Sequence, residues 1–447
     1  MRASKMSLGS GLRAFLLDVR GSYWFIPGLL ALLALLASLV TLGLDRSGAG
    51  VFLERYAFWQ PSAQGARDQL NAVTTSMITV AATVFAITIA AVSFASGNFG
   101  PRVLSNFMRD RGNQLALGVF IASFVYNLMV LRSIRGEMES AQPEFIPHIS
   151  VATGMVSVLL AVAMLVFFLH HIPASIRINT LVGSIGRRLL RDIAERFPHP
   201  GAGEEPKQVE SGTPIAAAQA GYIEVIDFKA LDTIAREEGV VISLRQRTGD
   251  FVHQAVPLAN IVGGELHGEA LNRFQRAFSI DDQRSYLQDL EFLFDELAEI
   301  TLRALSPGIN DPYTAVTCIH WMGAAMASLA GRELTRGPEQ EDYDRRLVRP
   351  ISDDFRHFLR RSFGSIRPSA AGSPVAAKVL LDTLVSVADA AASEDRRRAV
   401  VEEARILLAQ AETELAGPSL QELRDRLTRF ESEAAPPQDD VRLDPEL

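Results

Sequence analysis

The sequence predicts a mixed fold, with four transmembrane α-helices followed by an α+β domain that combines a small β-rich, barrel-sandwich-like module with further helices. Long apolar stretches, free of Asp, Glu, Lys and Arg, all begin before His171: Trp24–Leu44, Val73–Ser96, Asn113–Leu131 and Pro147–Phe168. A membrane-spanning helix needs roughly 20 predominantly apolar residues. The remainder is polar, and strand-like segments occur between Gly221 and Ile261.

These patterns predict five consecutive parts. They are a transmembrane domain (1–172), an amphipathic exit helix and linker (173–213), a β-rich module (214–265), a helical domain (266–432) and a disordered acidic tail (433–447). The exit helix is expected over Ile172–Phe197. The linker is the Pro-, Gly- and charge-rich segment His199–Thr213.

Charge and cysteine content exclude some classes of protein. A formal net charge of −8 argues against a nucleic-acid-binding protein, and the single cysteine, Cys318, excludes an intramolecular disulfide framework. Arginines concentrate before the first span, after the second and after the fourth. The positive-inside rule therefore predicts cytoplasmic N and C termini.

The second apolar stretch is rich in hydroxyl side chains. Thr75, Thr79 and Thr83 recur every four residues and share one helix face. This face is a candidate pore lining within a homo-oligomer, or a surface for close helix packing, and the two interpretations are compatible. Because the central spans lack charged side chains, a proton-coupled pump is disfavoured, and a conduit would require several subunits.

The β-rich module is predicted from three strands and one helix. The strands are Tyr222–Ile226, Val240–Leu244 and Val256–Ile261, and the helix is Phe228–Glu238, stopped by Gly239. Its hairpins, with GDFV before PLA, resemble those of biotinyl and lipoyl carrier domains. No lysine lies between residues 240 and 270, so no attached cofactor is expected; the module is predicted to sense a ligand, aid assembly or serve structure alone.

A long acidic helix is predicted over Ser279–Leu305, capped by Ser279, Asp281 or Asp282. Glu291, Asp295 and Glu299 follow one another at four-residue intervals. They are candidates for a divalent-cation or proton-sharing site. Alternatively, they form a solvated face or pair with basic neighbours, of which the candidates are Arg273, Arg276, Arg284 and Arg303.

The segment Ser306–Ala315 (SPGINDPYTA) is the sharpest local signature. Pro307 and Gly308 end one helix, while Asn310 or Asp311 caps the next. Asn310 and Asp311 are also candidates for a polar ligand pocket beside the acidic helix. No residue is assigned as catalytic or as a metal ligand.

The remaining chain is predicted to be helical over Val348–Ile366, Pro374–Ala392, Asp395–Ala416 and Ser419–Phe430. The first of these helices alternates arginines, Arg361 among them, with apolar residues. Its basic face is a candidate for contact with lipid headgroups or with the acidic helix. Simple solvation of that face is the alternative.

Four N-terminal spans, a GPRVLSNFMRDRGNQ loop, a GYI…RTGDFV…PLA module and a QDLEFLFDELAEITLRALSPGINDPYTA stretch occur in this order. Together they resemble a family of predicted bacterial membrane proteins catalogued as a domain of unknown function. The resemblance implies a bacterial inner-membrane protein, with the lipid bilayer as its surroundings. It implies no established activity and no catalytic residues.

The preferred hypothesis is an oligomeric pore or transport component with a cytoplasmic sensing or assembly domain, whose small ligand or permeant ion is unknown. One alternative is a membrane-anchored enzyme or metal-dependent sensor that uses Glu291, Asp295 and Asp311. The chain lacks a G-x-S-x-G, Walker or H-E-x-x-H motif, so an enzyme is the less favoured interpretation. An envelope scaffold is the third possibility.

Overall fold

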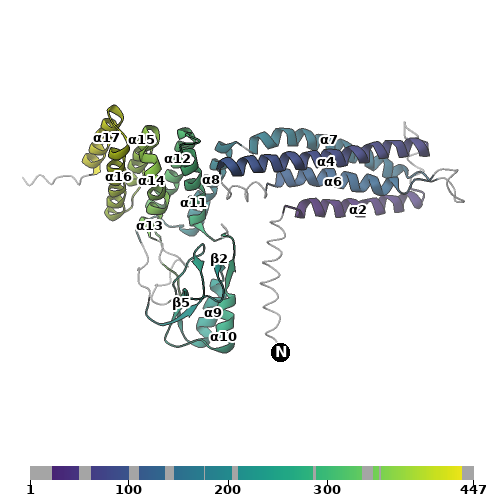
Figure 1. Cartoon of the computed structure of the whole chain (residues 1–447). Coiled ribbons are helices and arrows are strands. Elements are labelled where there is room, and N and C mark those ends of the chain that lie inside the picture. Colours follow the sequence, from purple (N-terminus) through teal and green to yellow (C-terminus); the bar gives the residue numbers. More distant parts are fainter. Residues whose placement is uncertain are drawn as a thin grey trace, which may run out of the picture. The chain divides into compact units, whose positions relative to one another are not determined.

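The computed structural model describes residues 23–49, 62–99, 110–135, 145–175, 177–203, 210–284, 288–334, 346–351 and 354–434. The chain divides into two compact units, an N-terminal unit (Met1–Thr180) and a C-terminal unit (Leu181–Leu447). Figure 1 shows long helices in the first, and a mixture of short helices and strands in the second. The predicted acidic tail lies almost wholly outside the described residues.

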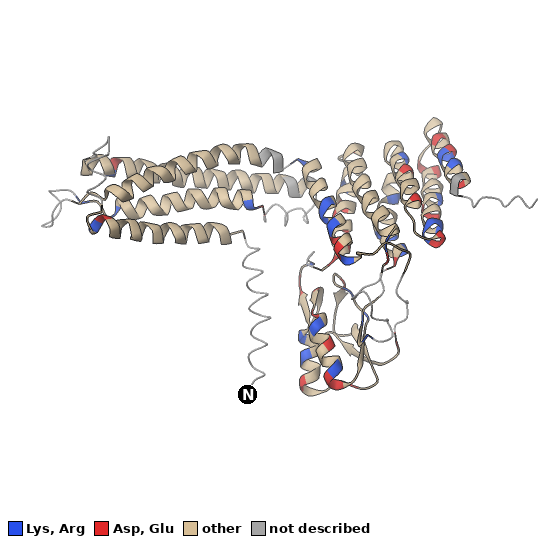
Figure 2. Ribbon diagram, turned by 180° about the vertical axis from the view of Figure 1, so that it is seen from behind, with Lys and Arg blue, Asp and Glu red and all other residues tan. Residues whose placement is uncertain are grey.

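The N-terminal unit contains four long helices: α2 (Phe25–Arg46), α4 (Ala63–Phe99), α6 (Arg111–Leu131) and α7 (His148–Ser175). Each is long and apolar enough to cross a membrane. Figure 2 shows them almost free of charged residues except near their ends. Helix α6 packs against the other three and is the most buried. The four predicted membrane helices are therefore confirmed.

Polar side chains fasten the helix ends within this unit. Asp45, in the last turn of α2, caps the start of α7: its carboxylate accepts from the Ile149 N–H at 2.9 Å and the Ser150 N–H at 3.0 Å. At the opposite end of α7, His171 Nε2 lies 2.8 Å from the carboxylate of Asp110, which caps α6. Two carboxylates thus connect the bundle at its two ends.

The C-terminal unit contains two small sheets. One has the strand order β1-β5-β3-β7, and the other β4-β2-β6. The strands are β1 (Thr213–Ala216), β2 (Gly221–Ile226), β3 (Val241–Leu244), β4 (Phe251–Val252), β5 (Pro257–Val262), β6 (Phe278–Asp281) and β7 (Val348–Arg349). Neither sheet closes into a barrel among the described residues.

Both sheets share one hydrophobic core with helices α9 (Phe228–Glu238) and α10 (Gly268–Arg276). The predicted helix Phe228–Glu238 is confirmed. Asp227 caps its start, and Gly239 ends it in the left-handed conformation, with φ of 66°. The core continues past residue 265, because Phe274 and Phe278 are buried within it.

Two helices begin later than the sequence predicted. Residues 278–281 form strand β6, which pairs with β2, and α11 (Leu290–Ala304) starts only at its cap Asp289. Likewise, Val348–Arg349 is a short strand parallel to β3, and α13 (Phe355–Leu359) starts after its cap Asp354. In both segments, pairing with a neighbouring strand overrode a helix-like apolar spacing.

The remaining helices are α8 (Ile178–Arg196), α12 (Pro312–Ala330), the π-helical turn η2 (Arg360–Gly364), α14 (Ser365–Ala371), α15 (Pro374–Asp389), α16 (Glu394–Glu414) and α17 (Pro418–Ala434). The predicted exit helix was placed too early, because α7 continues to Ser175 before α8 begins. The last three predicted helices correspond to α15, α16 and α17. Helix α12 packs against α11 and α15, and α16 packs against α15 and α17.

A buried arginine holds several chain ends together in this unit. Arg396 is 2% exposed and donates to the carbonyls of Gly201, Ala330 and Arg332 at 3.2, 3.1 and 2.7 Å. Two of these carbonyls lie at the end of α12, where the helix dipole favours a positive charge. The guanidinium thus joins α16, the end of α12 and the segment after α8.

Candidate functional site

The three threonines predicted to share a face of the second membrane helix lie on the outward surface of α4. Thr75, Thr79 and Thr83 are all exposed in the single chain. The Thr79 hydroxyl donates to the Thr75 carbonyl at 2.8 Å, and the Thr83 hydroxyl to the Thr79 carbonyl at 2.9 Å. Because backbone carbonyls of α4 accept these hydroxyl protons, the hydroxyls need no partner outside the helix. The face can therefore contact either lipid or another helix.

Small side chains follow the outward surface of α4 through Thr79, and the exposed side chains Ile78, Ile87, Ile89 and Phe94 flank them. With about 100° between successive residues, nine exposed positions between 72 and 93 lie within about 60° of Thr79. None is larger than threonine, and they are Ala72, Thr75, Ser76, Thr79, Ala82, Thr83, Ala86, Ala90 and Ser93. We call these nine residues the α4 small face.

The outward faces of α2 and α7 differ from the α4 small face. On α2, Leu36 is 50% exposed and Val40 62%, and on α7 Leu159 is 69% exposed. Large aliphatic side chains suit contact with lipid chains. Small ones let another backbone approach closely and are enriched where membrane helices pack together.

A second candidate site is a cluster of charged side chains in the C-terminal unit. Asp289 caps α11, and Glu291 and Asp295 lie one turn apart on that helix. Glu291 is 8% exposed and Asp289 3% exposed, so both carboxylates are largely shielded from water. Buried carboxylates need charged or hydrogen-bonding partners.

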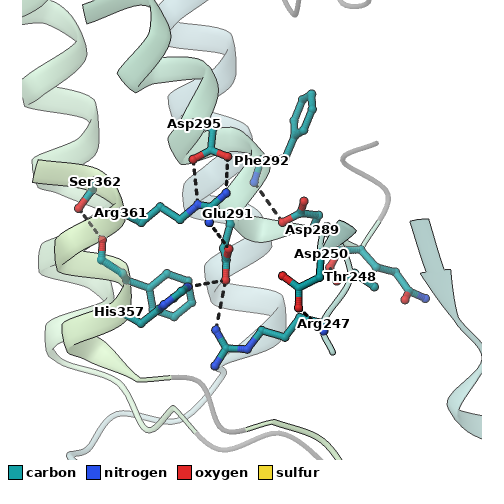
Figure 3. Close-up of polar contacts among 12 residues, drawn as sticks. Arg247, Thr248, Asp250, Asp289, Glu291, Phe292, Asp295, His357, Arg361 and Ser362 are labelled. Carbon is teal, nitrogen blue, oxygen red and sulfur yellow. Dashed lines mark hydrogen bonds and ion pairs between the residues drawn. The ribbon is translucent and has the colours of Figure 1, made fainter. Parts of the chain in front are cut away.

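Arg361 bridges two of these carboxylates (Figure 3). Its Nη1 lies 3.1 Å from Glu291, and its Nε and Nη2 lie 2.9 and 2.6 Å from the two oxygens of Asp295. Glu291 also contacts His357 Nε2 at 2.8 Å and Arg247 Nη1 at 3.3 Å. Arg361 belongs to the π-helical turn η2, a deviation from regular helix that is frequent at functional sites.

Arg284 completes the cluster by contacting both Asp289 and Asp295. The cluster therefore joins α11 to α13 and η2 through His357 and Arg361. It also joins α11 to the loop between β3 and β4 through Arg247. It forms an ionic joint between the helical and β-rich parts of one unit.

Burial and charge shift the acids in opposite directions. Burial alone raises the pKa of Glu291, but the His357 hydrogen bond and the positive charges of His357, Arg361 and Arg247 outweigh it and lower the pKa to about 2. Burial raises the pKa of Asp289 to about 6, although the hydrogen bond and charge of Arg284 oppose it. Glu291 thus stays ionised at neutral pH, while Asp289 titrates near pH 6.

The joint has little free space. A cavity of about 10 Å³ lies beside Arg247, Thr248, Asp289 and Glu291. This volume holds about one water molecule. The geometry supports an electrostatic connection, and it gives no room for a larger ligand at this cavity.

The structure brings Glu291 and Asp295 together but places the other predicted pocket residues elsewhere. Glu299 pairs with Arg303 at 3.5 Å. Asp311 caps α12 through the Thr314 N–H, and Asn310 is exposed with φ of 47°. Both follow the far end of α11, about 20 Å along the helix from Glu291 at 1.5 Å per residue. In the described ranges, no group of three or more His, Cys, Asp or Glu could hold a metal ion.

Sequence reasoning identified the carboxylates but not all of their partners. The pairing alternative is confirmed for Arg284 and Arg303, while Arg273 pairs with Glu237 instead. His357 and Arg247 were not singled out, because each lies far along the chain from the acidic helix. The basic segment around residue 361 was a usable signal, since it offered a counter-charge of the right sign.

Four apolar helices, long enough to span a bilayer and followed by a helix-rich unit with small sheets, define an integral membrane protein. The chain belongs to the family described as "Predicted membrane protein (DUF2254)", whose model matches residues 20–386. The predicted family resemblance is thus confirmed.

Two relatives are described as uncharacterized proteins: Rv1290c of Mycobacterium tuberculosis and Mb1321c of Mycobacterium bovis. This chain is 27% identical to each over 417 residues, which cover 91% of this chain and 79% of the relative. No solved structure matches.

Proposed function

We propose that this protein is an oligomeric transport component of a bacterial inner membrane, in which copies of the chain meet along the α4 small face. The observation that carries the proposal is the contrast between this face and the large aliphatic faces of α2 and α7. Lipid chains fill the spaces around either type of surface. Only the small face gains from the close approach of another helix.

The proposed conduit runs between copies of the chain, because the centre of the single bundle is filled. The centre of the N-terminal unit is occupied by α6, whose side chains Phe120 and Val130 are 1% and 0% exposed. Threonine hydroxyl oxygens on α4 retain lone pairs after donating their protons to the helix backbone. If several α4 helices surround an axis, these oxygens would line a polar, uncharged path.

The C-terminal unit would then be the cytoplasmic part of the assembly. Arginines flank the N-terminal side of α2 and follow α7, which supports cytoplasmic termini. The ionic joint around Glu291 is suited to hold the β-rich and helical parts in a fixed arrangement. A sensing or assembly role for this unit forms part of the same proposal.

Cysteine cross-linking tests the assembly. The protein's only cysteine, Cys318, is fully buried, so the wild-type chain should not cross-link and is the negative control. Thr79→Cys in membranes is expected to give a cross-linked dimer on oxidation. Leu36→Cys on α2 and Leu159→Cys on α7 are exposed controls that should remain monomeric. Equal cross-linking at all three positions would refute the α4 contact.

Solute flux tests transport separately. Purified protein in liposomes is expected to pass small ions or solutes, and Thr83→Phe should reduce the flux by filling the space between α4 helices. Leu159→Phe, on the lipid-facing side of α7, should leave it unchanged. Thr79→Cys cross-linking without any flux across a broad solute panel would retain the assembly and refute the transport role.

A further inference from the structure

Helices α8 and α12 run side by side in the same direction. Near the middle of each, Gly186 lies so close to Trp321 that an added Cβ would overlap the indole ring. At their ends, the Arg332 guanidinium donates to the Phe197 carbonyl at 2.7 Å. In both contacts, the residue from α12 lies about as far along its helix as the residue from α8 lies along α8, as expected for parallel helices. The first residues of α8 and α12 therefore lie at the same end of the helical part.

Two further helices have termini at this end. Helix α15 is parallel to α12, because Gly323 contacts Thr383 midway and the Ala392 N–H donates to the Ala330 carbonyl at 2.9 Å beyond their ends. Helix α11 precedes α12 through a short turn and is antiparallel to it. The end of α11 and the starts of α8, α12 and α15 therefore lie together, and we call this region the α12-start end.

Exposed apolar side chains concentrate at the α12-start end. Leu302 is 38% exposed, Ile309 44%, Tyr313 74% and Val375 39%. Among the described residues of α8 and of α11 to α17, the only other large apolar side chain exposed to this degree is Ile406. Exposed apolar groups that gather at one end of a domain are a candidate interaction surface.

Chain continuity attaches this same end to the membrane. The candidate membrane span in α7 ends at His171, the helix ends at Ser175, and α8 begins at Ile178. Three residues of extended chain cover at most about 10 Å. The chain alone therefore keeps the start of α8 within about 10 Å of the end of α7. The α12-start end is the end of the helical part that lies beside this connection.

We propose that Ile309 and Tyr313, with Leu302 and Val375 beside them, insert into the headgroup region of the bilayer. Tyrosine and aliphatic side chains together suit this boundary, because the ring is apolar and the hydroxyl remains hydrated. Arg177, directly before the start of α8, is also exposed and would attract anionic lipid headgroups. The turn between α11 and α12 is thus a membrane-contacting tip, independent of any transport role.

Lipid-quenching fluorescence tests the contact on the full-length protein. Ile309→Cys and Tyr313→Cys are each labelled with bimane, and the proteins are reconstituted into phosphatidylethanolamine–phosphatidylglycerol nanodiscs containing doxyl-labelled lipid. Both substituted side chains are exposed, so the changes should not disturb the fold. We expect quenching at these positions to be at least threefold stronger than at Ile406→Cys or Phe251→Cys, two exposed apolar controls away from the tip.

Quenching at Ile309 and Tyr313 equal to that of the controls would overturn the proposal. A blue-shifted bimane spectrum without lipid quenching would also overturn it, because that result would show the tip covered by protein. Replacing phosphatidylglycerol with phosphatidylcholine should weaken the quenching, since Arg177 would lose its anionic partner. No change with this replacement would remove the electrostatic part of the proposal.

Discussion

Glu291 provides the strongest test of the ionic joint. Its pKa of about 2, compared with 4.5 for an ordinary glutamate, corresponds to about 3 kcal/mol of stabilisation of the ionised folded state. Glu291→Gln removes the charge but keeps one oxygen as an acceptor. We therefore expect a loss of about 2–3 kcal/mol at pH 7, because Arg247, Arg361 and His357 lose a shared counter-charge.

The assay is thermal unfolding of the full-length protein in detergent, followed by the fluorescence of tryptophan, which includes Trp321 on α12. In a domain of this size, the expected loss lowers the unfolding temperature by about 5–10 °C. Glu299→Gln is the matched control, since Glu299 lies two turns further along α11 and pairs with Arg303 at 3.5 Å. Its half-buried pair should contribute less than the contacts of Glu291 do.

The pH dependence gives the sign of the effect. The pKa of Glu291 is lower in the folded state than in the unfolded state, so its ionised form stabilises the folded protein at any pH above about 4.5. This stabilisation is lost as the pH falls from about 4.5 toward 2. The part of the difference between wild type and Glu291→Gln that comes from the Glu291 charge should therefore be present at pH 7 and shrink below pH 4.5. A Glu291→Gln protein as stable as Glu299→Gln at pH 7 would refute the reasoning.

Three further substitutions test local features by thermal unfolding. The pKa of Asp289 is raised to about 6, so its protonated form favours folding, and this contribution is lost as the pH rises from about 4 through 6. Asp289→Asn should abolish that part of the dependence of stability on pH. Gly249→Ala should cost about 1–3 kcal/mol more than Gly263→Ala, because both have positive φ but only the first would also meet a carboxylate. Gly186→Ala should cost about 1–3 kcal/mol by overlapping the indole ring of α12, whereas Gly183→Ala on the same helix should cost less.

Much of the fold was predictable because local signals and tertiary packing agree. The four apolar stretches had few alternatives to membrane helices, and Asp311 followed by Pro312 gave α12 its start. The two misplaced helix starts share a cause. At Ser279 and Val348, pairing with distant strands determined the conformation, and no local spacing reports the position of those strands.

The charged cluster was only half predictable for a similar reason. Glu291 and Asp295 share a helix face, and their spacing reveals this relation directly. His357 and Arg361 reach them from 66 residues away, so no sequence interval links the two groups. The π-helical turn that carries Arg361 also changes the angular spacing of side chains, which a regular helical wheel does not represent.

The cap that Asp45 provides for α7 has a consequence for biosynthesis. The carboxylate at the end of the first described span is 104 residues before the amide of Ile149 that it binds. At about 5–20 residues per second, the ribosome needs roughly 5–20 s to deliver that amide. Helix α2 therefore enters the translocon or lipid before α7 has been made, and the contact between Asp45 and α7 forms only after α7 has been synthesised.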